Sequence, residues 1–466
     1  MQEGGDVATE QNKRTEEEKE RIVGQKPTGV SQMTNRAGQD PRMAALKCDW
    51  SWSEPTVWTT RMLVALEVGV KGGKWYSLND KLCSVATLEA AFAQVEANDG
   101  AAGVDHVTVE AFAKREDANL KRLSEELRTG HYRPQRIRRH YIPKLGSREK
   151  RPLGIPTVRD RVVQTALRMV LEPIFERDFA AHSYGFRPKR GCKDALRRVA
   201  ELLKAGYVHI VDVDLKSYFD TIPQDRLLAL VGQKMADGRV MALIKSFLEQ
   251  GVLDGDQEWV PEQGTPQGAV ISPLLSNIYL DPLDHLMAER GFEMVRYADD
   301  FVVMCRSEGE AAAALAEVQR WTASAGLTLH PTKTRLVNEA DGFDFLGYHF
   351  KAGRRWPRSK SRQKFRDTIR AKTKRSSGKS MTQIITDVNR TLRGWYEYFK
   401  HSYHPTFRIQ DGFIRRRLRT ILRKRTHRTG SARPNGADQT RWPNAYFAKL
   451  GLFSLEQADK LVRQSS

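Results

Sequence analysis

The chain of 466 residues can form about two to four domains, and its hydrophobic fraction of 40% is enough to build real cores. The formal net charge of +20 favours a polyanionic partner, with nucleic acid ahead of an anionic membrane surface. The four cysteines form no Cys-x-x-Cys pair, and no apolar run reaches the roughly 18–20 residues of a membrane span, which argues against a structural zinc site, a disulfide framework and a transmembrane protein.

The N-terminal part of the chain divides into a polar stretch and a helical stretch. Residues 1–54 are mostly polar and are predicted to be disordered, because they cannot bury enough apolar surface to offset the entropy of ordering. The charged residues 1–26 do not resemble a secretory signal peptide. Residues 55–103 predict two short amphipathic helices around a Gly-rich turn at 69–74, with a loop at 98–105.

Between about 104 and 350, helical segments alternate with short apolar strands. The pattern predicts a helix at 158–175 and a strand at 208–215. Because side chains alternate across a strand, Asp212 and Asp214 share one face of it and the apolar residues share the other.

Two further segments of this region have a clear pattern. Residues 293–303 predict two apolar strands that flank an acidic turn, and residues 310–326 predict a helix that ends at Gly326. Together, these segments predict an α+β fold with an antiparallel sheet.

From residue 351 onwards the chain becomes basic and helical. Residues 351–434 hold 26 Lys and Arg residues against four Asp and Glu residues, so the remaining chain is close to neutral. Apolar side chains at helical spacing predict helices at 382–399 and 413–424, followed by a linker at 429–439 and a short helical tail. A basic block of this kind is typical of a docking surface for phosphates.

Three aspartates stand where the predicted strands end: Asp214, Asp299 and Asp300. Carboxylates beside an apolar core are costly unless they are paired or bind a metal. Nucleotidyl transfer uses two divalent metals about 3.5–4 Å apart, and Mg²⁺ prefers hard oxygen ligands such as carboxylates. Taken alone, the pair Asp299–Asp300 is equally compatible with an ordinary hairpin turn, in which Asp is common.

The residues around the acidic turn resemble a known family. Residues 297–304, YADDFVVM, match the YxDD motif of reverse transcriptases. Further segments resemble the motifs of group II intron reverse transcriptases in their order along the chain. These are NDGAAGVDHVT (98–108), YIPKLGSREKRPLGIPTVRDRVVQ (141–164), SYGFRPKRGC (183–192), VDVDLKSYFDTI (211–222), GTPQGAVISPLLSNIYLDPLD (264–284), GLTLHPTKTRLV (326–337) and FDFLGYHF (343–350).

The resemblance extends over roughly residues 98–450 and implies a right-hand polymerase. Fingers and palm, with an antiparallel sheet, are expected over 104–350, and an α-helical thumb, called domain X in this family, over 351–428. Residues 429–466 are expected to form a tail that binds nucleic acid. Nothing in the sequence matches the HNH endonuclease that many relatives carry, so we expect no second-strand DNA cleavage.

The resemblance also implies roles for single residues. Asp214, Asp299 and Asp300 are expected to be the catalytic carboxylates and to bind two Mg²⁺ ions, for which Mn²⁺ could substitute. Phe219 is expected to pack under the incoming sugar and exclude a 2′-hydroxyl, although without the motif it would be taken for a core aromatic. Asp212 is expected to be structural.

Other residues are expected to hold the nucleotide and the primer–template duplex. Lys144 and Arg151 lie in the fingers motif and are expected to bind the triphosphate, for which a guanidinium is well suited. The alternative for both is a solvated basic loop, which fits the neighbouring Arg148 and Lys150 better than these two residues. Gln267 is expected to contact the nucleotide or template from a tight turn, and Lys333 and Tyr297 to contact primer and template.

The basic helices are expected to bind RNA, because basic residues attract phosphates and aromatic rings can stack on unpaired bases. Most of the aromatic residues, however, are expected to form the core of a helical bundle. The residues expected to bind RNA are Arg393, Trp395, Arg415, Arg416 and Arg417.

These expectations describe an RNA-directed DNA polymerase of a group II intron that also binds the intron RNA as a maturase and assists intron mobility. The expected partners are group II intron RNA, an RNA template with a DNA primer, target DNA and dNTPs, with a homodimer as one option and no membrane. The expected location is the bacterial cytoplasm, in association with the nucleoid. The alternatives are a free-standing reverse transcriptase in defence or repair and an RNA-binding splicing factor with a dispensable polymerase. Phe219 and the Pro-Gln-Gly turn argue against a viral-type RNA polymerase.

Overall fold

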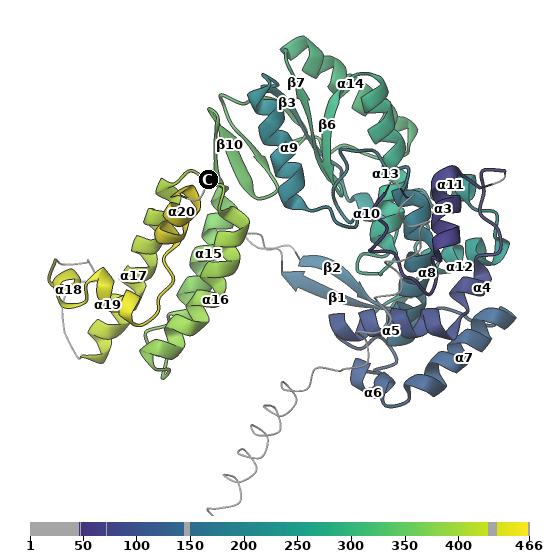
Figure 1. Cartoon of the computed structure of the whole chain (residues 1–466), viewed down its shortest axis with the longest axis horizontal. Helices are drawn as coiled ribbons and strands as arrows, with labels where there is room; N and C mark the ends of the chain where they lie inside the picture. The colour runs from purple at the N-terminus through teal and green to yellow at the C-terminus, as the bar shows by residue number, and fades with distance from the viewer. Residues whose placement is uncertain (1–45, 47, 71, 144–149, 427–435, 465–466) are drawn as a thin grey trace, which may run out of the picture. The chain divides into compact units, whose positions relative to one another are not determined.

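The computed structural model describes residues 46, 48–70, 72–143, 150–426 and 436–464 (Figure 1). The chain divides into two compact units, residues 1–71 and 72–466. In the first unit, helix α3 (Thr60–Val68) carries Glu67, whose carboxylate accepts a hydrogen bond from the Trp50 indole at 2.9 Å. Most of the polar stretch that is predicted to be disordered lies outside the described residues.

The second unit begins with helices that pack on one another through apolar faces. Their bounds are α4 (Asn79–Leu82), α5 (Val85–Asn98), α6 (Val109–Ala113), α7 (Glu116–Thr129) and α8 (Val158–Glu176). Helix α5 buries Leu88 and Phe92 and lies against α8. Helix α8 confirms the prediction for 158–175, and the Thr157 hydroxyl caps its first turn by accepting a hydrogen bond from the Asp160 amide.

A four-stranded sheet in the order β2-β1-β4-β5 combines two strands that precede α8 with two strands from later in the chain. Its strands are β1 (Ile137–Pro143), β2 (Lys150–Ile155), β4 (Val252–Asp254) and β5 (Gln257–Trp259). Strands β1 and β4 are parallel, and the other neighbours are antiparallel. The amide of Gly154 on β2 donates a hydrogen bond to the Gln267 carbonyl, so β2 and the turn at Gln267 lie side by side.

A second four-stranded sheet is antiparallel throughout, in the order β6-β7-β3-β8. Its strands are β3 (His209–Asp214), β6 (Glu293–Tyr297), β7 (Asp300–Cys305) and β8 (Arg335–Asn338). The helices of this part of the chain are α9 (Cys192–Lys204), α10 (Tyr218–Thr221), α11 (Gln224–Lys234), α12 (Gly238–Leu248), α13 (Ser272–Glu289) and α14 (Glu308–Ser324). Helices α9 and α13 contact β6, while α14 contacts β3 and β7 (Figure 1). The predicted α+β fold with an antiparallel sheet is therefore confirmed.

The C-terminal part combines a small sheet with a helical bundle. The sheet contains β9 (Phe343–Phe345), β10 (Tyr348–Lys351) and β11 (Arg354–Pro357). The helices are α15 (Ser359–Lys372), α16 (Met381–Phe399), α17 (Pro405–Arg425), α18 (Gly436–Arg441), α19 (Asn444–Lys449) and α20 (Leu455–Gln464). Their shared core includes Ile385, Leu392, Phe407 and Phe447. In the described part of the chain, no helix is long and apolar enough to cross a membrane.

Two predicted boundaries in this part are wrong. Helix α17 begins at Pro405 rather than at 413, because proline suits the first turn of a helix and Phe407 is buried in the bundle core. The linker predicted at 429–439 is wrong for residues 436–439, which belong to α18 and are tied to α17 by the ion pair between Asp438 and Arg423. Residues 427–435 lie outside the described ranges.

Candidate active site

The acidic turn joins β6 to β7. Tyr297 and Asp300 are paired across the hairpin, so Ala298 and Asp299 form a two-residue turn. Ala298 has a positive φ of 60°, which is the backbone conformation that tight hairpin turns require. Behind the turn both strands are largely buried, so the carboxylates lie at the end of an apolar hairpin.

The neighbouring strand β3 brings a further carboxylate to the turn. Asp214 is the last residue of β3 and lies opposite Asp300 of β7 in the antiparallel register. Asp212 lies two residues earlier, and its carboxylate accepts a hydrogen bond from Arg335 Nε at 3.2 Å. The fold thus brings Asp214 to the Asp299–Asp300 turn, while Asp212 is engaged by β8.

The electrostatics of this cluster favour a cation. Desolvation by the surrounding side chains and the negative charges of Asp212 and Asp299 raise the pKa of Asp300 to about 7, and Arg358 opposes this shift. Because the Asp300 side chain is exposed to solvent, we attribute the shift chiefly to repulsion between the carboxylates. A bound cation would cancel that repulsion.

Lys333 supplies one positive charge at this position. Its Nζ lies 3.1 Å from Asp214 Oδ1 and 3.2 Å from Asp214 Oδ2. The donor chemistry, carboxylate oxygens that attract a cation, fits Mg²⁺ or Mn²⁺. Within the described ranges, no three Asp, Glu, His or Cys side chains converge closely enough to hold one ion, so a metal would have to draw the carboxylates together.

Phe219 lies on the short helix α10, close to β3 and the turn. Its ring packs edge-on against Phe186, with 6.5 Å between the ring centroids, and against Tyr218 at 5.5 Å. Phe186 is 45% exposed and has a positive φ of 59°, a conformation that a bulky side chain adopts only when its surroundings enforce it. The sequence predictions did not single out Phe186, and its only signal is its place in the segment SYGFRPKRGC.

Gln267 lies in a turn that packs tightly on β2. Its Nε2 donates a hydrogen bond to Asp220 Oδ2 at 3.0 Å. Gly268 has a φ of 103°, and a Cβ there would overlap the carbonyl of Gly154, so glycine is required on both counts. A cavity of about 420 Å³ lies between this turn, strands β1 and β2 and the β4–β5 hairpin, and both Gln267 and Asp220 line it.

The structure describes two of the three other residues predicted to hold the nucleotide or the duplex. Lys144 lies outside the described residues, and the backbone of Arg151 lies on β2 opposite Ile142. The Tyr297 hydroxyl hydrogen bonds with the Cys192 thiol at the start of α9, and this bond raises the pKa of Tyr297 to about 12. Tyr297 therefore connects the acidic turn to α9.

The predicted RNA-binding residues of the bundle differ in how far they are available. Trp395 is half-buried, stacks on Phe365 with 4.5 Å between ring centroids and packs against the bundle core. Arg417 donates hydrogen bonds to the hydroxyl and carbonyl of Thr373, at 3.1 and 2.8 Å, and so ties α17 to α15. Arg416 is exposed.

The remaining two predicted RNA-binding arginines have contacts within the bundle. Arg393 is exposed and its guanidinium lies over the Phe453 ring, 4.9 Å from the centroid, while Arg415 lies 3.7 Å from Asp411. Between the bundle and Asp300 lies a cavity of about 600 Å³, lined also by Arg358, Lys364 and Trp395. The bundle therefore presents cations beside the carboxylate cluster.

Comparisons with known proteins agree with this arrangement. Residues 142–350 match the family model for reverse transcriptase (RNA-dependent DNA polymerase), and residues 362–439 match the model for the group II intron, maturase-specific domain. Protein YkfC of Escherichia coli (strain K12) is 36% identical over 285 residues, which cover 53% of this chain and 74% of that protein.

Other relatives match over smaller parts of their length. Group II intron-encoded protein LtrA of Lactococcus lactis subsp. cremoris is 38% identical over 201 residues, 43% of this chain and 33% of that protein, so the matching part spans about a third of LtrA. Among solved structures, a chain of a partial Cas6-RT-Cas1–Cas2 complex is 23% identical over 53% of this chain and 41% of that chain, with a TM-score of 0.35, which is too low to support an argument.

Proposed function

The chain belongs to the family of group II intron reverse transcriptases and maturases, and on this premise we propose that it is an RNA-directed DNA polymerase that also binds its intron RNA and assists splicing. The observation that supports the polymerase most strongly is the register of β3 and β7, which aligns Asp214 with Asp300 beside the Asp299 turn. The maturase activity is supported by the matched maturase-specific domain over 362–439.

In the proposed reaction, Asp214, Asp299 and Asp300 would hold two Mg²⁺ ions, which would activate the primer 3′-hydroxyl and stabilise the departing pyrophosphate. Lys333, which pairs with Asp214 in the free chain, would contact a phosphate of the primer. The Phe219 ring, braced edge-on by Phe186, lies under the sugar of the incoming dNTP and excludes a 2′-hydroxyl.

The proposed substrates are an RNA template with a DNA primer, and the primer end lies in the cavity of about 600 Å³ between Asp300 and the bundle. Arg358 and Lys364 line that cavity and attract the primer phosphates. The exposed Arg416 and Arg393 bind phosphates of the intron RNA. Target DNA supplies the primer during intron mobility.

One substitution separates the two activities. Asp299→Ala should abolish DNA synthesis and leave protein-assisted splicing of the cognate intron nearly intact, because the ribozyme catalyses splicing and the protein only stabilises its fold. Asp117→Ala, at an exposed carboxylate on α7, is the control and should change neither activity. Loss of both activities in a folded Asp299→Ala protein would contradict the separation. A wild-type protein that assists splicing but extends no primer would instead be an RNA-binding splicing factor.

A further inference from the structure

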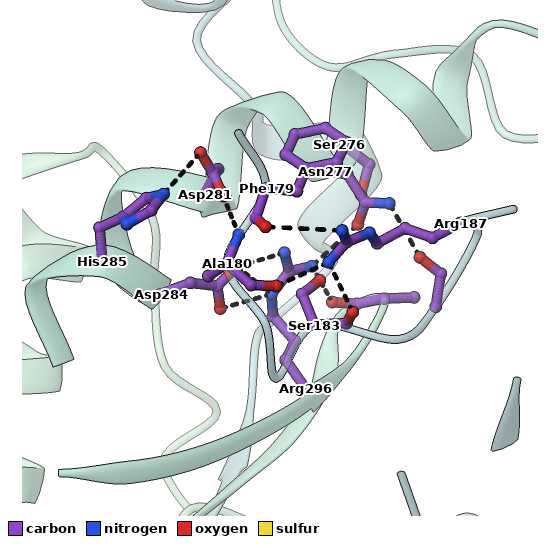
Figure 2. A network of polar contacts seen from close by, with 12 residues as sticks. Phe179, Ala180, Ser183, Arg187, Ser276, Asn277, Asp281, Asp284, His285 and Arg296 are labelled. Carbon is purple, nitrogen blue, oxygen red and sulfur yellow. Dashed lines mark hydrogen bonds and ion pairs between the residues drawn. The ribbon is translucent and has the colours of Figure 1, made fainter. Parts of the chain in front are cut away.

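A buried polar cluster lies directly beneath the acidic turn, and Arg296 is at its centre (Figure 2). Arg296 is the last residue but one of β6, directly before Tyr297, and is fully buried. Its Nε donates hydrogen bonds to both carboxylate oxygens of Asp284, at 2.8 and 3.0 Å. Its Nη1 donates to Asn277 Oδ1 and to the Ala298 carbonyl, each at 2.9 Å.

The last of these bonds reaches the acidic turn itself. The Ala298 carbonyl belongs to the peptide that joins Ala298 to Asp299. Arg296 therefore holds, by a hydrogen bond, the peptide directly before the Asp299 Cα. Burial lowers the pKa of the Arg296 guanidinium, but the charge of the Asp284 carboxylate and its hydrogen bonds outweigh this effect. The pKa therefore lies above its usual range. The cation that holds the turn is therefore permanent.

Asn277 extends the same cluster to the nucleotide side of the site. While its Oδ1 accepts from Arg296, its Nδ2 donates a hydrogen bond to the Gly185 carbonyl at 2.8 Å (Figure 2). The next residue, Phe186, is the ring that packs on Phe219. The side chain of Asn277 thus joins the Arg296 guanidinium, which holds the Ala298 carbonyl, to the backbone that precedes Phe186.

The residue before Asn277 adds a third connection. The Ser276 carbonyl accepts a hydrogen bond from the fully buried Tyr218 hydroxyl at 2.7 Å, and Tyr218 immediately precedes Phe219. One turn of α13 therefore contacts three chain segments, and each of them bears a residue of the candidate active site. Packing alone does not explain this choice of side chains, since a buried ion pair is often no more stable than apolar residues of similar volume.

We propose that Arg296, held by Asp284 and Asn277, is a positioning residue of the acidic turn, and that Asn277 couples this turn to the Phe186–Phe219 pair. The proposal rests on the polymerase function proposed above. It adds that the geometry of the Asp299 carboxylate and the shape of the nucleotide site depend on one buried cluster, which contacts neither metal nor substrate.

Two aspartates on α13 provide a matched test. Asp284→Asn removes the charge that compensates Arg296. Asp281→Asn removes a carboxylate one turn earlier on the same helix, where Asp281 accepts from the Ala180 amide at 3.1 Å and pairs with His285, without contact to the acidic turn (Figure 2). Both variants are compared with the wild type in single-nucleotide extension of a DNA primer on an RNA template, in Mn²⁺ binding and in thermal melting.

We expect Asp284→Asn to lower kcat at least tenfold and to weaken Mn²⁺ binding, while KM for the dNTP changes less than threefold. Asp281→Asn should stay within twofold of the wild type in kcat, in KM and in the dissociation constant for Mn²⁺. A kcat for Asp284→Asn within twofold of wild type, even with a lowered melting temperature, would mean that the cluster is merely structural and would overturn the proposal. If Asp284→Asn does not fold, Asn277→Ala decides by the same kcat criterion, and it should also raise KM because it releases the Phe186 segment.

The test also separates this proposal from the proposed function. If the wild-type protein extends no primer, the polymerase function fails, and Mn²⁺ binding alone decides the positioning role. Weaker Mn²⁺ binding in Asp284→Asn than in Asp281→Asn would then support the role of the cluster, and equal binding in the two variants would refute it.

Discussion

Gly185→Ala should show how closely the acidic turn is held by the chain around it. A Cβ on Gly185 would overlap the Ala298 nitrogen and lie 2.8 Å from the Tyr297 carbonyl carbon. Ordinary contact begins at 3.4 Å, so the shortfall from the Tyr297 atom alone is about 0.6 Å. Both neighbours are backbone atoms that cannot rotate away, so the turn itself must move. Because a misplacement of about 1 Å can cost a hundredfold in rate, we expect kcat to fall about 10- to 100-fold.

The assay is single-nucleotide primer extension at saturating dNTP, together with thermal melting. Overpacking of this kind should also destabilise the protein by about 1–3 kcal/mol. The control is Gly412→Ala, within helix α17, where a Cβ would meet nothing within 4 Å. It should stabilise the protein by roughly 0.5–1 kcal/mol and leave kcat unchanged. A Gly185→Ala protein with wild-type kcat and melting temperature would refute the tight packing of residue 185 on the turn.

Three further predictions concern charge. Lys333→Ala should strengthen Mn²⁺ binding to the free protein up to about fivefold, as expected if an exposed ion pair with Asp214 worth up to ~1 kcal/mol competes with the metal; unchanged binding by electron paramagnetic resonance titration would contradict this. Because the folded-state pKa of Asp300, about 7, lies above its ordinary 3.8, the metal-free protein should lose stability as pH rises from about 4 to about 7. Added Mg²⁺ should restore this stability. A melting temperature that does not fall between pH 4 and pH 7, or that Mg²⁺ does not raise at pH 7, would argue against the carboxylate cluster. Arg417→Ala should destabilise the bundle by about 1–3 kcal/mol, since it removes two half-buried hydrogen bonds to Thr373 that tie α17 to α15. Arg416→Ala should leave the melting temperature unchanged and lower the salt dependence of RNA binding by about one counterion. Equal melting temperatures for the two variants would contradict this difference.

The part of the site that could be predicted from sequence is the part carried by strands. Side-chain alternation along 208–215 requires Asp212 and Asp214 to share a face, and the structure confirms the strand as β3. The two apolar runs around Asp299 likewise predict the hairpin, which the pairing of β6 and β7 confirms. Such local patterns show which face of a strand is buried. They therefore also show which side chains at the end of the strand are left outside the core.

The supporting cluster could not be predicted in the same way, because its partners are distant in the chain. Arg296 was part of an apolar strand pattern, and a charged residue there signals only that some partner must exist. That the partners are Asn277 and Asp284 depends on how α13 packs against β6. The close approach of Gly185 to the turn has no local signal either, since glycine is equally common in ordinary loops.

The bundle illustrates a related limit. Helical spacing correctly predicts the helix at 382–399, but spacing alone cannot distinguish a side chain that faces the core from one that faces a ligand. Trp395 packs on Phe365 against the bundle core and is half-buried, since it also lines the cavity beside Asp300. Arg417 is engaged by Thr373, while the neighbouring Arg416 remains exposed. Adjacent arginines thus differ in availability through tertiary contacts that the sequence does not encode locally.

The proposed function requires that the carboxylates joined by β3 and the β6–β7 turn catalyse DNA synthesis on an RNA template. The most direct measurement is extension of a DNA primer annealed to RNA by the purified protein with Mg²⁺ and dNTPs, in parallel with Asp299→Ala and with the exposed-carboxylate control Asp117→Ala. We expect extension by the wild type and the control and none by Asp299→Ala. Equal extension by Asp299→Ala, or no extension by a folded wild-type protein that binds the primer–template, would contradict it.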